Sequence, residues 1–471
     1  HGSDRGGEIT ELFLADKTRL ADYNLKDCEL VSDIFRETGL LDFAIARSAM
    51  TGLNMDRLGG SVASFDNLYL PRLHREGFVA PNAPSEPPDS PGGFVLDSTP
   101  GIYDHVLVLD FKSLYPSIIR TFHIDPIGLA LGVAGELEEA DTVPGFRGGR
   151  FAREGHILPD LIASLWQQRD AAKADDDQPL SQAIKIIMNS FYGVLGSPGC
   201  RFFDTRLASS ITLRGHQILQ DTRDYIERAG HRVIYGDTDS VFVWIHEATD
   251  DASAIAAGRE LEVALNTWWR ERVHNEFGVE SALELEFETH YQRFLMPTVR
   301  GSDKGSKKRY AGLVATPEGA KMVFKGLENV RTDWTRLARE FQQELYRRVF
   351  LGEPFEAWVR ELVAEVRAGE HDDQLVYRKR LRRKLNEYEK NVPPHVQAAR
   401  QCESRGLKAP RRGGWVEYVI TAAGAEPAET PLAPLDYQHY IDRQLEPVAD
   451  GILGFAGTSF SALVDEQFAL F

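Results

Sequence analysis

The sequence has few cysteines and no long apolar run. Its 471 residues include three cysteines, Cys28, Cys200 and Cys402, which lie far apart and form no CxxC pair. This spacing excludes a disulfide framework and a zinc ribbon. The longest apolar runs are a handful of residues, such as 106–109, whereas about 20 are needed to cross a bilayer. No charged-then-apolar signal segment opens the chain. We therefore expect a soluble intracellular protein without a membrane partner.

Positive charge is also in the minority, with 54 Lys and Arg against 71 Asp and Glu, a net charge of −17. Two stretches run against this balance. Residues 378–384 (RKRLRRK) hold six basic side chains, and residues 300–309 hold five basic side chains and one acidic one. An acidic body with two confined basic stretches fits a protein that binds a polyanion in a groove. A solvated helix face is the alternative interpretation of the same charges.

At about 150 residues per domain, the length suggests three domains of ordinary globular composition. Hydrophobic periodicity predicts helices over 8–47, over 161–173 and 180–195 as an antiparallel pair, and from 331 onward. Strands are expected at 105–110, in a hairpin over 232–245, and near 283–288, 309–315 and 321–324. The proline-rich stretch 80–93 predicts a loop, and a short helix is expected over 117–122, just after Pro116.

Three aspartates stand at the ends of expected strands. Asp110 ends the strand 105–110, and Asp237 and Asp239 lie on the hairpin turn. If these strands are neighbours, the carboxylates converge and repel, and a bound hard cation with oxygen ligands best relieves that repulsion. Two Mg²⁺ ions at such a site suit phosphoryl transfer. A polar hairpin turn without any ligand is the simpler alternative for Asp237 and Asp239.

The stretch 237–241 (DTDSV) also fits the DxDx(T/V) pattern of haloacid-dehalogenase-like phosphohydrolases. In those enzymes the motif follows a parallel strand and leads into a crossover. Here residues 241–245 continue directly as another expected strand, which favours a hairpin and disfavours the phosphohydrolase interpretation.

The expected helix 180–195 carries two different faces. Ile184, Ile187, Met188 and Phe191 share one face and predict a buried stripe. Gln182, Lys185, Asn189 and Tyr192 share another face, which could meet a nucleotide. On the preceding helix, Arg169 and Lys173 could add phosphate contacts. A plain amphipathic helix pair is the alternative.

Taken together, these motifs resemble those of the family B (alpha-like) DNA polymerases. Residues 110–119 (DFKSLYPSII) resemble the first palm motif of that family, and residues 185–193 (KIIMNSFYG) resemble its fingers motif. Residues 235–240 (YGDTDS) resemble the second palm motif, and residues 307–310 (KKRY) resemble the basic motif near the primer terminus. The order and separations agree, and the resemblance extends from about Asp16 to the C-terminus.

The resemblance implies a role for each matched position. Asp110 and Asp239 would be the principal catalytic metal ligands, Asp237 a third and less directly engaged carboxylate, and Phe111 would offer its carbonyl. The implied cofactor is a pair of Mg²⁺ ions, for which Mn²⁺ can substitute. The nucleotide-binding set would comprise Phe111, Ser113, Leu114, Tyr115, Arg169, Lys173, Lys185, Asn189 and Tyr192. The DNA-binding set would comprise Lys307, Lys308, Arg309, Tyr310, Tyr377, Arg378, Arg380, Arg382, Arg383 and His395.

Two shorter matches lie near the ends of the chain. Residues 23–27 (YNLKD) resemble the third motif of the family's 3′→5′ exonuclease, with Tyr23 and Asp27 as its remnant. The earlier exonuclease motifs and the family's N-terminal domain are not in this sequence, so we expect a fragment with incomplete proofreading. A solvated or capping Asp27 is the alternative. At the other end, Gln467, Leu470 and Phe471 resemble the peptide that docks bacterial polymerases on the sliding clamp; a tail packed on the thumb is the alternative.

The fold implied is α+β, a polymerase right hand with an antiparallel-sheet palm, helical fingers and a mostly helical thumb. The expected parts are an exonuclease remnant and connector (1–75), the palm (76–150 and 201–335), the fingers (151–200) and the thumb with its tail (336–471). The implied function is DNA-templated addition of deoxynucleotides (dNTPs) to a primer 3′-hydroxyl, in DNA repair or damage bypass, in the cytoplasm at the nucleoid. A catalytically silent polymerase-like scaffold, which binds primer-template DNA without turnover, is the alternative.

Overall fold

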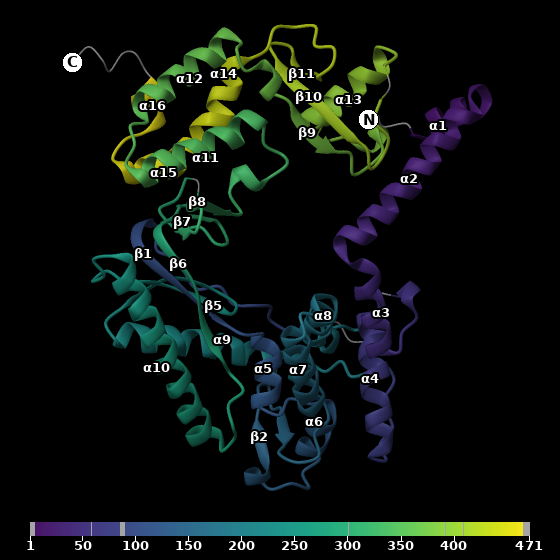
Figure 1. The fold of residues 1–471 in the computed structure, drawn as a ribbon, viewed down its shortest axis with the longest axis vertical. Helices are drawn as coiled ribbons and strands as arrows, with labels where there is room; N and C mark the ends of the chain where they lie inside the picture. Colours follow the sequence, from purple (N-terminus) through teal and green to yellow (C-terminus); the bar gives the residue numbers. More distant parts are fainter. Residues whose placement is uncertain are drawn as a thin grey trace. The chain divides into compact units, whose positions relative to one another are not determined.

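The computed structural model describes residues 5–57, 59–84, 90–299, 301–390, 392–407 and 409–464, with side chains from residue 9 onward (Figure 1). The chain divides into two units. The larger holds residues 26–97 and 105–290, and the smaller holds residues 1–25, 98–104 and 291–471. Three elements continue from one unit into the other: α2 (Lys17–Thr38), β1 (Gly101–Phe111) and β6 (Leu285–Met296).

The larger unit is built on a sheet in which the strand order is β4-β5-β1-β6. The central strand β5 (Ser240–Trp244) pairs antiparallel with both β4 (Arg232–Asp237) and β1. Helix α9 (Thr205–Arg228) packs on β4 and β5, and it is joined to α10 (Asp251–Phe277) by a hydrogen bond from Trp269 Nε1 to Thr222 Oγ1 (3.1 Å). The other elements of this unit are α3 (Leu40–Thr51), α4 (Ser61–Arg75), α5 (Leu114–Thr121), α6 (Pro126–Val133), β2 (Thr142–Pro144), β3 (Arg150–Ala152), α7 (Leu158–Ala174) and α8 (Gln178–Leu195), with 3₁₀ turns at Met55–Arg57 and Glu139–Asp141.

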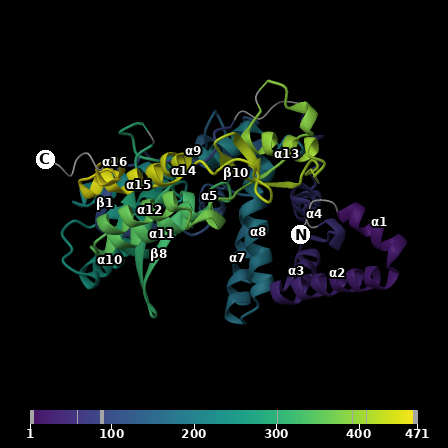
Figure 2. The same cartoon turned by 90° about the horizontal axis from the view of Figure 1, so that it is seen from above.

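Helices α7 and α8 lie side by side, as both views show (Figures 1 and 2). The start of α8 follows from its sequence: the Asp177 side chain caps it by accepting a hydrogen bond from the Leu180 backbone N–H (3.0 Å), and Pro179 lies in the first turn. The predicted apolar stripe of α8 is buried, since Ile184, Ile187, Met188 and Phe191 are all fully inaccessible. The face with Gln182, Lys185 and Asn189 is exposed.

A fully buried carboxylate joins three helices of the larger unit. Asp125 Oδ2 accepts a hydrogen bond from the backbone N–H of Gly128 (3.0 Å) and so caps α6. Its Oδ1 accepts from the Tyr69 hydroxyl on α4 (2.9 Å) and from the backbone N–H of Leu158 on α7 (2.8 Å). A buried acceptor is stabilised only when such donors are present, so Asp125 fixes α4, α6 and α7 to one another.

The smaller unit has its own apolar core, the last strands of the six-stranded sheet (order β4-β5-β1-β6-β7-β8) and a three-stranded sheet. In one sheet β7 (Tyr310–Thr316) lies between β6 and β8 (Gly319–Lys325), and in the other β10 (Trp415–Thr421) lies between β9 (Tyr377–Arg380) and β11 (Gly424–Pro427). Its helices are α1 (Arg5–Ala15), α11 (Arg336–Leu351), α12 (Glu356–Ala368), α13 (Pro394–Ser404), α14 (Tyr437–Tyr440), a π-helical turn (Ile441–Leu445), α15 (Glu446–Leu453) and α16 (Phe460–Val464), with 3₁₀ turns at Glu328–Val330, Asp372–Gln374, Leu385–Glu387 and Gly454–Ala456.

The mixed helix-and-sheet fold with antiparallel sheets is confirmed, and so are the predicted hairpin and the helix pair. The helix expected over 117–122 begins three residues earlier, at Leu114. The sheet of β9, β10 and β11 was missed, and the helical interpretation of the basic stretch 378–384 is wrong, because it begins as strand β9.

The expected parts of the right hand stay predictions. Residues 467–471, with the expected clamp peptide, lie outside the described residues. In the described part of the chain, no helix is long and apolar enough to span a membrane.

Candidate active site

The hairpin of β4 and β5 carries Asp237 and Asp239, and its strand β5 pairs with β1, which carries Asp110. Its turn is two residues long, Thr238 and Asp239, and Thr238 has a positive φ of 59°. On the central strand, Ser240 is the register partner of both Asp110 on β1 and Asp237 on β4. The backbone N–H of Phe111 then donates to the carbonyl of Asp239 (2.9 Å). Strand pairing therefore places Asp110 next to Asp239. It also rules out the phosphohydrolase interpretation, because the motif lies on an antiparallel hairpin.

The pKa of Asp110 is shifted by its burial and by the charged side chains around it, among them Asp239. Burial, followed by the charges of Asp239, Glu288 and Glu286, raises the pKa of Asp110 to about 7, and the ammonium group of Lys185 acts in the opposite direction. Removal of water and nearby like charges both disfavour the ionised carboxyl. The two glutamates on β6 were missed by the sequence analysis, because alternating acidic residues on a strand look like an ordinary solvated face.

Asp237 is engaged differently. Its carboxylate accepts hydrogen bonds from the hydroxyls of Thr238 (3.0 Å) and Tyr235 (3.4 Å). Within the described ranges, the one group of three His, Cys, Asp or Glu side chains whose ligand atoms all lie within 4.8 Å of one another is elsewhere. The three aspartates therefore stand further apart than joint ligation of a single ion requires. The lesser engagement expected of Asp237 stays a prediction.

The donors at this site fit a divalent cation. Asp110 and Asp239 supply carboxylate oxygens, and the Phe111 carbonyl belongs to the residue that bonds to Asp239. Such all-oxygen sets suit hard ions. Burial and then the neighbouring carboxylates raise the pKa of Asp110, and a bound cation would offset both effects.

Tyr115 stands beside these carboxylates at the start of α5. Its ring lies 4.5 Å from that of Tyr192 on α8. Burial, then Tyr192, Asp239 and Asp237, raises the pKa of Tyr115 to about 12. Ser113, which precedes the helix, has a positive φ of 45°. The backbone N–H groups of the first helical turn lack intrahelical acceptors, so those of Leu114 and Tyr115 can donate to an anion.

The segment before β1, residues 93–95, also contacts the β4–β5 turn, and the sequence did not predict this contact. The backbone N–H of Thr238 donates to the carbonyl of Phe94 (2.8 Å), and Val95 forms an antiparallel bridge with Asp237. A Cβ at Gly93 would lie 2.8 Å from Thr238 Oγ1 and 3.3 Å from the Tyr115 hydroxyl. Gly93 is thus packed between the turn and the tyrosine, a contact that sequence patterns do not reveal.

One cation of the helix pair lies near the carboxylates, and the other expected phosphate contacts stay predictions. Lys185, exposed on α8, is close enough to influence Asp110. On α7, Arg169 is half-buried and Lys173 is exposed, and the Arg169 Nε is buried without a hydrogen-bond partner. No described contact joins Arg169, Lys173 or Asn189 to the carboxylates.

The basic motif 307–310 lies in the smaller unit and divides into two kinds of residue. Lys307 and Lys308 are exposed. Arg309 forms an ion pair with buried Glu328, which also accepts a hydrogen bond from Gln342 (2.9 Å). The ring of Tyr310 packs 5.2 Å from that of Phe294. Arg309 and Tyr310 are therefore structural in part, and the two lysines are the exposed cations.

The second basic stretch is the edge strand β9 with the residues that follow it. Arg378 lies 4.6 Å from the Trp415 ring, Arg380 donates to the Gly413 carbonyl (2.6 Å), and Arg382 and Arg383 are exposed.

Tyr377 and His395 require a correction to the sequence analysis. Tyr377 is buried, with its ring 5.1 Å from that of Tyr418, and His395 is buried on α13. Buried side chains do not reach a duplex, so the expectation of direct contact is wrong for both. The exonuclease-like residues Tyr23 and Asp27 lie on α2, which has no buried residue.

Comparisons with known proteins agree with this geometry. The family model described as DNA polymerase family B matches residues 59–452. The chain is 55% identical to DNA polymerase II of Escherichia coli (strain K12), over 99% of this chain and 60% of that protein. It is 27% identical to a DNA polymerase of Thermococcus gorgonarius, over 92% of this chain and 57% of that protein.

A solved structure is similar as well. The family B DNA polymerase of Pyrobaculum calidifontis matches with a TM-score of 0.64 and 28% identity, over 94% of this chain and 58% of that one. The chain spans about 60% of the length of the curated relatives it matches. Because the family model covers most of its length, the chain belongs to DNA polymerase family B.

Proposed function

We propose that this chain is a DNA-templated DNA polymerase that adds deoxynucleotides to a primer 3′-hydroxyl. The observation that carries the proposal is the strand register that sets Asp110 beside Asp239, with Lys185 of α8 near enough to lower the pKa of Asp110. Nucleotidyl transfer requires metal ions at the reacting oxygens and positive charge beside the triphosphate. The two carboxylates can bind the ions, and the Lys185 ammonium group can supply the positive charge. The family membership supports the same reaction.

In this proposal Asp110, Asp239 and the Phe111 carbonyl would hold two Mg²⁺ ions, which when bound activate the primer hydroxyl and neutralise the leaving pyrophosphate; Mn²⁺ can substitute. Lys185 and Arg169 neutralise the triphosphate. The backbone N–H groups of Leu114 and Tyr115 orient it, since they point out of the first turn of α5. These groups are held on helices and strands, so they are pre-organised for the transition state.

The right-hand arrangement is part of the proposal. The sheet with Asp110, Asp237 and Asp239 would serve as the palm, the pair α7 and α8 as the fingers, and residues from 336 onward as the thumb. Primer-template DNA would be bound by the exposed basic side chains Lys307, Lys308, Arg382 and Arg383, through phosphates and without sequence preference. A role in repair or damage bypass, at the nucleoid in the cytoplasm, follows from the likeness to DNA polymerase II, and the sliding clamp is its proposed partner.

Primer extension tests the proposal. The 471-residue chain, a labelled primer-template, the four dNTPs and Mg²⁺ should give template-directed extension. Asp239→Asn should lower the extension rate by about 10²-fold or more, since one negative charge at the ion site is lost. Asp141→Asn, which removes a carboxylate outside the site, is the control and should extend normally.

Duplex binding without extension by the unmodified chain would overturn the proposal and favour a silent scaffold. Binding of primer-template should be nearly the same for the unmodified chain and Asp239→Asn, because phosphate contacts are made by other residues. Extension by Asp239→Asn at more than a tenth of the normal rate would remove that residue from the ion site.

A further inference from the structure

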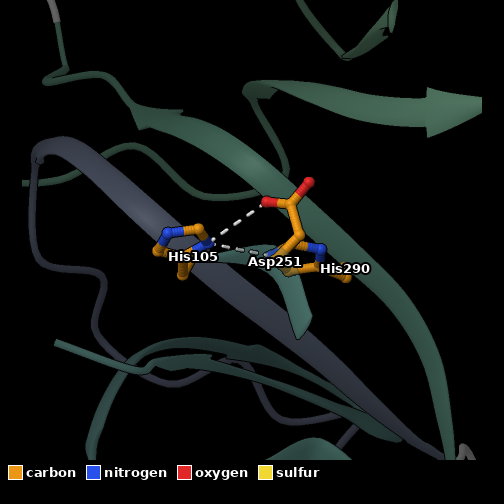
Figure 3. Close-up of side chains that lie close together, drawn as sticks. All are labelled: His105, Asp251 and His290. Atoms are coloured by element: carbon orange, nitrogen blue, oxygen red, sulfur yellow. Dashed lines mark hydrogen bonds and ion pairs between the residues drawn. The ribbon is translucent and has the colours of Figure 1, made fainter. Parts of the chain in front are cut away.

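Two histidines and an aspartate meet at a second place in the larger unit, away from the carboxylates of the hairpin. His105 lies near the beginning of β1, His290 lies on β6, and Asp251 is the first residue of α10. Figure 3 shows the three side chains pointing toward one another from these separate elements. In the part of the chain that the structure describes, this is the one group of three such side chains with ligand atoms all within 4.8 Å of one another.

The distances between the donor atoms match the edges of a metal coordination shell. His105 Nδ1 lies 3.2 Å from His290 Nε2 and 3.6 Å from Asp251 Oδ1. With metal–ligand bonds of about 2.1 Å, ligand atoms of a tetrahedral ion stand about 3.4 Å apart. Two of the three edges are therefore already close to that spacing, and the third is no longer than 4.8 Å. The exposed part of Asp251 leaves room for a water as a further ligand, since its side chain is 42% accessible.

The surroundings also hold the two imidazoles together. The two rings are stacked, with an interplanar angle of 11°, and all three side chains are partly buried. Imidazole nitrogens are common ligands of zinc-class ions, so the two histidines suit such an ion.

The backbone supports the same assignment. His105 has a positive φ of 57° within a strand, a conformation that costs energy for a residue with a side chain. Its carbonyl is held by the backbone N–H of Ile245 (3.0 Å). His105 keeps this conformation within the sheet, and its imidazole contacts His290 and Asp251.

We propose that His105, Asp251 and His290 form a binding site for a divalent cation of the zinc class. Two imidazole nitrogens and one carboxylate oxygen suit Zn²⁺ and its neighbours, whereas Mg²⁺ takes oxygen ligands. The site would fasten the beginning of α10 to β1 and β6. A histidine pair joined only by an N–H···N hydrogen bond is the competing explanation.

Calorimetric titration of Zn²⁺ into the 471-residue chain in excess Mg²⁺ tests the proposal. The Mg²⁺ occupies oxygen-ligand sites such as the hairpin carboxylates and competes poorly at imidazoles. One Zn²⁺ should bind per chain. His290→Gln and Asp251→Asn should each weaken that binding at least tenfold. His156→Gln is a matched control, because His156 also contacts another histidine, His123, edge to face (ring centroids 4.6 Å), and lies 3.4 Å from a carboxylate, that of Asp160. This variant should bind Zn²⁺ normally.

A second measurement needs no variant. Zn²⁺ should protect His105 and His290, and not His156, from diethylpyrocarbonate modification followed by mass spectrometry. Co²⁺ as a substitute probe should give visible d–d bands that disappear on addition of Zn²⁺. Unchanged Zn²⁺ affinity in both variants, or equal modification of His105 and His290 with and without Zn²⁺, would overturn the proposal and leave a hydrogen-bonded histidine pair.

Discussion

The rings of Tyr115 and Tyr192 lie 4.5 Å apart with an interplanar angle of 46°, and this contact joins the start of α5 to α8. The ring of Tyr115 is also near Gly93, since a Cβ there would lie 3.3 Å from the Tyr115 hydroxyl. Rotation of the Tyr115 ring away from this position would break its contact with Tyr192.

Tyr115→Ala should therefore reduce the selectivity of the polymerase for deoxyribonucleotides over ribonucleotides. We expect the preference for deoxyribonucleotides over ribonucleotides, measured as the ratio of kcat/KM values, to fall by about tenfold or more, since the ring excludes a 2′-hydroxyl by its bulk. Tyr115→Phe keeps the ring and should retain the preference. An unchanged ratio in Tyr115→Ala would show that the tyrosine only packs against Tyr192.

Gly93→Ala should impair extension while leaving the fold intact. The added methyl group would lie 2.8 Å from Thr238 Oγ1 and must shift the Thr238 side chain, which donates to Asp237 next to Asp239 in the turn. Displacements of this order cost about 10- to 100-fold in rate when they move a catalytic group. Gly92→Ala is the matched control, because a Cβ there meets nothing within 4 Å. Equal primer-extension rates for the two variants would contradict the prediction.

Replacing both Arg382 and Arg383 by Ala should make DNA binding less sensitive to salt. Each phosphate contact contributes about 0.9 to the slope of log K against log salt, so the slope should fall by about 2. Fluorescence anisotropy with a short primer-template at several salt concentrations measures it. Arg336→Ala removes an exposed arginine of the same unit that is paired with Glu340 (2.8 Å), and the slope should stay the same.

Asp125→Ala should destabilise the larger unit by about 3 kcal/mol or more. The change leaves the Tyr69 hydroxyl and the backbone N–H groups of Gly128 and Leu158 without their buried acceptor. Asp177→Ala removes a helix cap that is exposed and should cost about 1 kcal/mol. Urea unfolding followed by circular dichroism compares the two, and equal losses would refute a special role for the buried carboxylate.

The sequence was most informative where residues close together in the sequence determine the local structure. The buried stripe of α8 follows from the 3.6-residue period, and the β4–β5 hairpin follows from two β-branched runs on either side of a short polar turn. The carboxylates Asp110 and Asp239 could be singled out because Asp110 ends such a run and Asp239 lies in the turn between two of them.

The sequence was least informative where a strand or a contact depends on segments that are far apart in the sequence. Strand β9 carries three consecutive basic residues, Arg378 to Arg380, and lacks the alternation that marks a strand; it exists because β10, some 35 positions later, pairs with it. Glu286 and Glu288 matter only because β6 lies beside β1. His105 and His290 are 185 positions apart, and no local pattern connects them.

The two-residue turn between β4 and β5 has a consequence for how this protein can vary. Ser240 is in register with Asp237 on one side and Asp110 on the other, so an inserted or deleted residue at the turn would shift one strand against its neighbour. A one-residue slip exchanges the two faces of a strand. A library of single-residue insertions and deletions should thus be far more damaging between 237 and 240 than a library of substitutions at Thr238, since chain length there is the constrained quantity.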